Sequence, residues 1–247
     1  MQIDIRQLEH DGPHTTPWHK HESGQLFWLS HGLIVIETEQ SQWAVTPGSV
    51  GWFPANVHHR AKSMGTVRGK CLYLAPSFGG DSAPHSGIYR ADTFIFELLS
   101  RICHSAKTLF PDDYRDALLH VLDCEMALMD ELPLQLTLPE DRRARNVANE
   151  LLNDPGCMLN QAQLAQKWGI SVRNLSRLFN QETGLSFSQW RQQAKVLSSL
   201  QWVLAGLPVA EIAALSGYSN VSAYIEIFRQ RFGKTPGQFK GQGQTSA

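Results

Sequence analysis

The sequence predicts a two-domain protein with an all-β N-terminal domain, a helical connector and an all-α C-terminal domain. Short apolar runs separated by turn residues occupy residues 24–76, which is typical of strands. Helical spacing of apolar residues replaces them after residue 88. The charge also changes sign, because residues 139–247 hold twelve Lys and Arg against seven Asp and Glu, whereas residues 1–138 hold ten against sixteen.

The N-terminal domain is expected over residues 1–88. Its apolar runs are "GQLFWLS", "GLIVIETE", "QWAVT", "SVGWFP" and "KCLYLA". Strands this short and this evenly spaced predict a sandwich or a barrel.

The helical connector is expected over residues 89–135, with helices at 92–106 and 112–130. An apolar helical stripe shows only that something covers it. The helices therefore either pack on their own β-domain or pair with a second subunit, which would make the protein a homodimer.

The C-terminal half carries one pattern twice, as "LAQKWGISVRNLSRLFNQETG" at 164–184 and "IAALSGYSNVSAYIEIFRQRFG" at 212–233. Each copy predicts a helix-turn-helix, in which Gly169 or Gly217 provides the positive φ of a tight turn. Ser171 and Ser219 are placed to cap the second helix of each pair. The alternative is that two helical hairpins resemble each other because hairpins have few ways to pack.

One long helix is predicted between the copies, starting at Ser186 or Ser188 and ending at Gly206. About 18 helical residues at 1.5 Å each span about 27 Å. A rod of this length could hold two recognition helices about 34 Å apart, one turn of DNA.

Over about 140–240 the chain resembles the AraC/XylS family of bacterial transcription regulators, most specifically in "IAALSGYSNVSAYIEIFRQRFGKTPGQF". The resemblance implies a sequence-specific regulator that binds double-stranded DNA, with RNA polymerase as a further partner. It implies a DNA-binding domain over 139–240, with helix-turn-helix motifs at about 161–182 and 209–232.

The resemblance also implies which side chains contact DNA. Arginine can bond guanine, serine can bond several bases, and apolar carbons can touch thymine methyl groups. The candidates for base contacts are Arg173, Asn174, Ser176, Arg177, Val221, Ser222, Ile225 and Glu226. The candidates for phosphate contacts are Arg191, Lys195, Arg229, Arg231 and Lys234.

Glu226 stands where many relatives carry a basic residue. Either it accepts a hydrogen bond from cytosine N4, or the second motif binds weakly and the first supplies most of the affinity. We favour weak binding by the second motif.

All ten histidines lie at or before His120, so histidine chemistry belongs to the acidic half. The segments "HKHESGQLFWLSHG" and "GSVGWFPANVHH" resemble the two motifs of the cupin β-barrel. The resemblance makes His19, His21, Gln25 and His59 candidates for a metal or effector pocket. Gln25 replaces the usual glutamate of metal-binding cupins, which counts against a metal.

Two interpretations of the pocket remain open: a divalent metal, or a small organic effector among polar histidines. A cupin-type metalloenzyme with a helical regulatory domain is the alternative function. A protein–protein adaptor is a third. We expect a regulator and no enzyme.

The longest aliphatic run is "LIVI", far shorter than the roughly 20 residues of a membrane span. The N-terminus has no apolar core like that of a signal peptide. The four cysteines lack metal-site spacing and predict buried thiols. We therefore expect a cytoplasmic protein without a membrane partner.

Overall fold

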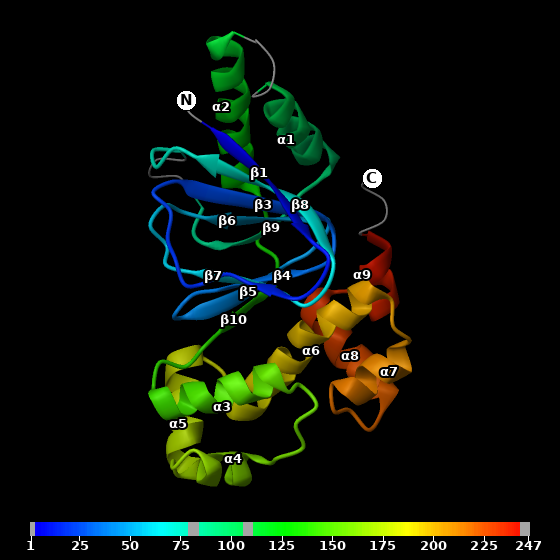
Figure 1. Ribbon diagram of the computed structural model, residues 1–247. Coiled ribbons are helices and arrows are strands. Elements are labelled where there is room, and N and C mark those ends of the chain that lie inside the picture. Colours follow the sequence, from blue (N-terminus) through cyan, green and yellow to red (C-terminus); the bar gives the residue numbers. More distant parts are fainter. Residues whose placement is uncertain (1–2, 79–83, 106–110, 243–247) are drawn as a thin grey trace. The chain divides into compact units, whose positions relative to one another are not determined.

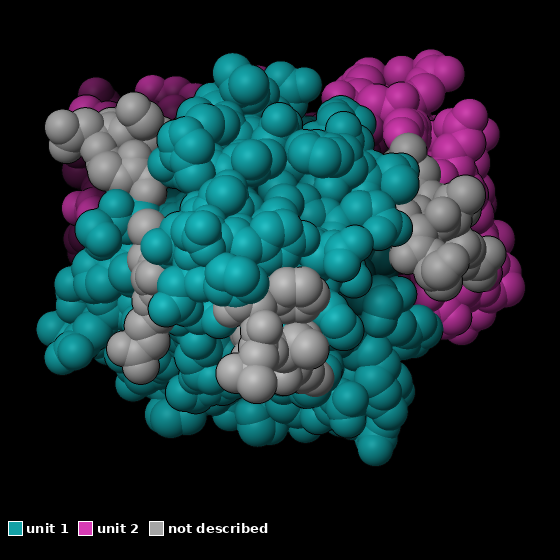
Figure 2. Space-filling model, turned by 90° about the horizontal axis from the view of Figure 1, so that it is seen from above, with its two compact units in different colours: residues 1–36, 43–134, 242–247 teal, residues 37–42, 135–241 magenta. Residues whose placement is uncertain are grey.

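The computed structural model describes residues 3–78, 84–105 and 111–242 (Figure 1). The chain forms two compact units (Figure 2). Unit 1 consists of residues 1–36, 43–134 and 242–247, and unit 2 of residues 37–42 and 135–241. The sheets thus belong mainly to the first unit and the helices from residue 142 onward to the second.

Two five-stranded sheets form the β-layers (Figure 1). The first has the order β1 (Asp4–His10), β8 (Val67–Leu74), β3 (Gly24–His31), β6 (Ser49–Phe53) and β9 (Gly87–Arg90). The second has the order β10 (Gln135–Thr137), β5 (Ser41–Val45), β4 (Ile34–Glu37), β7 (Arg60–Ser63) and β2 (His14–Thr15). The named pairs of the first sheet are antiparallel, and Leu26 of β3 lies between Trp52 and Leu72.

One face of the first sheet is covered by α1 (Thr93–Ser105) and α2 (Asp112–Leu128) (Figure 1). Because side chains alternate along a strand, Leu26, Trp52 and Leu72 share this face and enter one buried cluster with both helices. The helices therefore pack on their own β-domain. Residue 106, the expected end of the first helix, lies outside the described residues.

The other face of the first sheet carries an aromatic group beside the second sheet. Phe53 of β6 makes edge contacts with Phe27 of β3 and Trp43 of β5, with ring centroids 5.9 and 5.3 Å apart. All three side chains are buried. Phe53 also stacks on His59, with ring centroids 6.2 Å apart, so the aromatic group extends to this histidine.

Unit 2 is helical from residue 142 onward. Its helices are α3 (Arg142–Asn153), α4 (Gln161–Lys167), α5 (Val172–Thr183), α6 (Phe187–Ala205), α7 (Val209–Leu215), α8 (Val221–Phe232) and α9 (Pro236–Gln242). The predicted long helix is α6, which begins after a capping box at Ser186 and ends at Gly206.

The long helix α6 organises the core of unit 2. Trp190 is fully buried, packs on Phe179 of α5 and donates its indole N–H to the carbonyl of Thr137 at 2.7 Å. Farther along, Ser199 shares a 2.9 Å hydrogen bond with the buried hydroxyl of Tyr224 on α8. One helix thus holds both α5 and α8 through buried aromatic side chains that also find polar partners.

Three expectations need correction. The cap of α8 is Asn220 and not Ser219, because the Asn220 side chain accepts from the N–H groups of Ser222 and Ala223. Cys124 is exposed, whereas the other cysteines are buried. The sequence did not predict the strands β1, β2, β7, β9 and β10. Among the described helices, none has the length and hydropathy of a membrane span.

Candidate functional site

The pair α4 and α5 presents one polar and one apolar face. Gly169 in the turn has φ +63°, and the Ser171 hydroxyl caps α5 by accepting from the N–H of Asn174 at 3.2 Å, both as predicted. The stripe of Leu175, Leu178 and Phe179 is buried. The opposite side of α5 exposes the predicted base-contacting residues, of which Asn174 is half-buried and Arg173, Ser176 and Arg177 are exposed.

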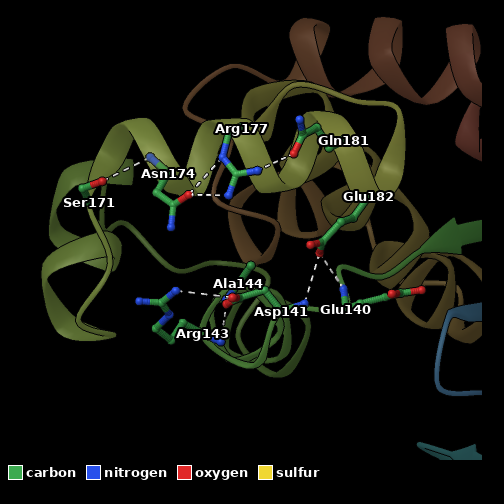
Figure 3. Close-up of polar contacts among 9 residues, drawn as sticks. All are labelled: Glu140, Asp141, Arg143, Ala144, Ser171, Asn174, Arg177, Gln181 and Glu182. Atoms are coloured by element: carbon green, nitrogen blue, oxygen red, sulfur yellow. Dashed lines mark hydrogen bonds and ion pairs between the residues drawn. The ribbon is translucent and has the colours of Figure 1, made fainter.

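The exposed side of α5 is organised by hydrogen bonds (Figure 3). Arg177 donates to the Asn174 amide oxygen from Nε at 3.1 Å and Nη2 at 2.7 Å, and to Gln181 from Nη1 at 2.5 Å. Ser176 accepts from Gln161 of α4 at 2.8 Å. The sequence reading missed Gln161 and Gln181. Spacing of i, i+4 from Arg177 could have indicated Gln181.

The C-terminal end of α5 is fixed to the start of α3 (Figure 3). One carboxylate oxygen of Glu182 accepts from the backbone N–H groups of Glu140 at 2.7 Å and Asp141 at 3.1 Å. Asp141 in turn caps α3 by accepting from the N–H groups of Arg143 and Ala144. These bonds hold α5 on a rigid support, which recognition geometry requires.

The pair α7 and α8 repeats this arrangement. Gly217 has φ +68°, as predicted, and Asn220 caps α8. Tyr224 and Phe228 are buried. Of the predicted base-contacting residues on the other side, Ile225 is half-buried and Val221, Ser222 and Glu226 are exposed.

The carboxylate of Glu226 is held inside its own helix. Oε2 accepts from Nη2 of Arg229 at 2.7 Å, and Oε1 accepts from Nε2 of Gln230 at 3.2 Å. The pair with Arg229 offsets the positive charge that this part of α8 would otherwise present to a polyanion.

Three of the predicted phosphate-contacting cations donate hydrogen bonds to backbone carbonyl groups within unit 2. Arg191 donates to the carbonyls of Cys157 and Leu159, the latter at 2.6 Å. Lys195 donates to the carbonyl of Gly217 at 3.1 Å, and burial lowers its pKa. Arg231 donates to the carbonyl of Gln135 at 2.5 Å, and burial lowers its pKa as well.

Arg191 and Lys195 nonetheless line an open cleft of about 340 Å³ in unit 2. No carboxylate belongs to its described lining, which is completed by Asn160, Gln161, Phe187, Ser188, Gln192 and Tyr218. The other two predicted cations differ: Arg229 is exposed and Lys234 is half-buried.

Comparison with known proteins identifies the family to which the chain belongs. A model of the "Helix-turn-helix domain" family matches residues 164–242. The thermoregulatory protein LcrF of Yersinia pestis is 30% identical over 236 residues, covering 88% of this chain and 80% of LcrF. The chain belongs to the AraC-type family of helix-turn-helix transcriptional regulators.

Two further matches are a curated relative and a solved structure. The HTH-type transcriptional regulator NimR of Escherichia coli K12 is 29% identical over 226 residues, covering 91% of this chain and 82% of NimR. Among solved structures, ToxT of Vibrio cholerae is 10% identical with a TM-score of 0.43, covering 98% of each chain. The relatives are named as regulators and not as enzymes, so the metalloenzyme alternative is not supported.

Unit 1 of the regulator contains a cavity of about 240 Å³ rich in histidine. Its polar lining is Arg6, His10, His14, Thr16, His19, His21, Gln25, His59, Lys62, Ser63 and Tyr73. Its apolar lining is Leu8, Phe27, Ile34 and Ala61. None of these described residues carries a carboxylate. All four residues predicted for the pocket thus line one cavity.

Three of the histidines converge. His19 and His59 exchange backbone N–H to carbonyl hydrogen bonds of 2.9 and 2.8 Å, which bring their rings to 4.6 Å between centroids. His21 lies two residues beyond His19, and their ring centroids are 4.7 Å apart. The candidate ligand atoms of the three residues lie within 4.8 Å of one another.

The surroundings of His21 and His59 disfavour the protonated form of both rings, so the pKa of each is lowered. Burial, together with His19 and His59, lowers the pKa of His21 to about 4. Burial also lowers the pKa of His59. Gln25 is buried beside them, with its amide nitrogen 3.9 Å from Sγ of Cys71, and the buried hydroxyl of Ser63 has no hydrogen-bond partner among the described residues.

Proposed function

We propose that the regulator reads DNA with two helices of unit 2, α5 and α8, as the second helices of two helix-turn-helix motifs. The observation that carries the proposal is the division of α5 into a buried apolar stripe and an exposed polar row. A helix with this division can pack on its own domain and still offer donors and acceptors to base edges.

The α5 row is the main reading surface in this proposal. Arg173 is exposed, and its guanidinium makes no hydrogen bond with any described residue. Arg177 is exposed and oriented by Asn174 and Gln181. Either guanidinium can bond O6 and N7 of guanine, and Ser176 can bond a neighbouring base.

The α8 row is less polar and supplies less affinity. Val221 and Ile225 offer carbon atoms to thymine methyl groups, and Ser222 offers a hydroxyl. Glu226 opposes phosphate, although Arg229 and Gln230 hold its carboxylate. This arrangement supports the interpretation in which the first motif supplies most of the affinity.

Phosphate contacts would position both helices. Arg229 and Lys234 are candidates near α8. The cleft lined by Arg191 and Lys195 has positive charge and no described carboxylate, which suits a phosphate. Arg231 donates its guanidinium to the carbonyl of Gln135 and contributes by joining α8 to β10.

The salt dependence of DNA affinity tests this proposal. A site selected from random duplexes would be titrated with the full chain by fluorescence anisotropy at several salt concentrations. The proposal predicts that log affinity falls linearly with log salt, with a slope of about −0.9 per neutralised phosphate. An affinity independent of salt would contradict it and would favour the adaptor alternative.

Unit 1 is the sensing part in this proposal, with a cupin-like barrel over 1–88 and the connector over 89–135. Its cavity is lined by both apolar side chains and polar groups, a combination that is typical of sites for small molecules. An effector, either an organic molecule or a metal ion, shifts the regulator between states only by its differential affinity for them. The DNA-binding domain over 139–240 would then change its contacts with DNA or with RNA polymerase.

The regulator would form a homodimer through α2. While one side of α2 enters the core of unit 1, the other side exposes a seam with the 3,4 spacing of a coiled coil. The seam consists of Tyr114, Ala117, Val121, Cys124 and Leu128, and Leu128 is 80% exposed. A second copy of α2 carries the same spacing and would cover it.

A further inference from the structure

The three converging histidines come from segments that the fold fixes. The backbone bridge between His19 and His59 holds two of them opposite each other. His21 projects to the same side as His19, because side chains two residues apart in an extended segment share a face. The carbonyl of His21 is also fixed, since it accepts from the N–H of Asn56 at 2.7 Å.

Two of the rings are oriented by the backbone. Nδ1 of His19 lies 2.8 Å from the carbonyl of Pro17, and Nδ1 of His59 lies 2.8 Å from the carbonyl of Val57. A carbonyl only accepts, so Nδ1 carries the proton in both rings and Nε2 keeps its lone pair. Metal-bound histidines are held in the same manner, with one nitrogen donating to the protein and the other free to bind the ion.

The third ring has no competing partner. Neither ring nitrogen of His21 makes a hydrogen bond with a described residue, and the ring rests edge-on against Tyr73 at 5.2 Å between centroids. A tetrahedral ion about 2.0–2.1 Å from each nitrogen requires nitrogen separations of about 3.4 Å. Since the three ligand atoms already lie within 4.8 Å of one another, small side-chain rotations close the site.

The surrounding cavity lacks the negative charge that would balance a divalent ion. Gln25 is a neutral amide. Apart from the histidines, the ionisable side chains of the described lining that carry charge at neutral pH are the cations Arg6 and Lys62. An ion bound by three neutral imidazoles keeps its full double charge in this low-dielectric setting. It would therefore attract an anionic ligand at its remaining coordination position.

We propose that His19, His21 and His59 form a three-imidazole site for a first-row divalent metal ion such as Zn²⁺, with a fourth position open to the cavity for a carboxylate oxygen of the effector. This deepens the proposed sensing function and rests on it. Such ligand sets, with three protein nitrogens and one exchangeable position, bind Zn²⁺ in a tetrahedral arrangement. The proposed site accounts for the three histidines that converge in the cavity, which a purely apolar pocket would not require.

The metal is tested with the full chain after treatment with chelator and gel filtration. Co²⁺ is the spectroscopic probe, because a four-coordinate ion absorbs visible light far more strongly than the hydrated ion, and Zn²⁺ is titrated in parallel by calorimetry. We expect one ion per chain and an intense visible spectrum. His19→Ala and His21→Ala should each weaken affinity by at least about 100-fold, whereas the exposed His120→Ala on α2 should not.

Several outcomes would overturn the proposal. The first is the absence of stoichiometric Zn²⁺ binding. The second is equal affinity for Zn²⁺ in the wild type, His19→Ala and His21→Ala. The third is a Co²⁺ spectrum as weak as that of the hydrated ion. Each variant is first shown to be folded by circular dichroism. His21, which is half-buried, serves as the second variant if His19→Ala fails to fold.

The open position is tested by adding acetate to the Co²⁺-loaded chain. A shift in the visible bands is expected, and an unchanged spectrum up to high acetate would contradict the open position. DNA affinity is measured on the same metal-free samples. If the chain fails to bind metal but still binds DNA in a salt-dependent manner, only the metal site is overturned. If it binds metal but not DNA, only the proposed DNA-binding function is overturned.

Discussion

At the residue scale, the charge that Glu226 presents to DNA depends on the side chains that bind its carboxylate. Sequence reasoning found the acidic residue within α8 but did not pair it with Arg229 and Gln230, which lie three and four residues farther along the helix and donate to its two oxygens. The exposed residues of α5 were predictable from periodicity. Their hydrogen-bond network was not, because Gln161 reaches Ser176 from another helix.

Replacing Glu226 by Gln should strengthen DNA binding to a similar degree for every sequence. The substitution removes a charge that repels phosphate and frees the Arg229 guanidinium, so the gain is electrostatic. Anisotropy titrations against the selected duplex and against duplexes changed at single positions measure it. A relaxed preference confined to one base pair would instead support cytosine recognition.

At the element scale, the helices of unit 2 were predictable because their boundaries are set locally. Ser171, Ser186 and Gly206 act at the positions that the sequence suggested. Strands such as β1 and β9 were not predictable, because β1 is mostly polar and β9 has only four residues, and both are stabilised by pairing with β8 and β6. The same dependence on distant segments hid most of the cavity lining, although the four residues predicted from the cupin-like motifs do line it.

The turns of the two helix pairs differ in what surrounds them. Both Gly169→Ala and Gly217→Ala place a side chain at positive φ, which costs about 1 kcal/mol. Only at Gly217 would the added Cβ crowd neighbours, lying 2.9 Å from Nζ of Lys195 and 3.1 Å from the carbonyl oxygen of Gly156, whereas nothing lies within 4 Å at Gly169.

Gly217→Ala should therefore destabilise its helix pair more than Gly169→Ala does. Hydrogen–deuterium exchange of the full chain, followed by mass spectrometry, reports the local opening free energy of each pair. Faster exchange over α7 and α8 in the first variant than over α4 and α5 in the second is the expected result. Equal effects would show that the crowding at Gly217 relaxes at no cost.

At the scale of the whole molecule, the exposed seam of α2 predicts the oligomeric state. Val121 lies at the middle of the seam and is 38% exposed. Val121→Glu should convert the dimer to a monomer, because it would place a charge in a covered apolar contact. Sedimentation velocity over a range of concentrations measures the change, with Asp116→Glu on the same helix as the control. A wild-type chain that stays monomeric at all concentrations would contradict the dimer.

The proposed division between a sensing unit and a DNA-binding unit follows from features of the sequence, the charge asymmetry, the repeated pattern and the cupin-like motifs. Where each cation acts could not be predicted, because Arg191, Lys195 and Arg231 bind carbonyl groups contributed by segments distant in sequence. These hydrogen bonds give the three cations a structural role in unit 2 in addition to the phosphate contacts that the sequence predicts.

The most direct test of the central claim is a methylation-protection footprint of the full chain on its selected site. Guanine N7 lies in the major groove, so protection reports the grooves that α5 and α8 occupy. Two protected clusters about 10 base pairs apart on one face are predicted for each bound copy of the chain, and Arg177→Ala should remove the cluster read by α5 while Arg101→Ala on α1 leaves both. A single cluster, or two clusters unaffected by Arg177→Ala, would contradict reading by two helices.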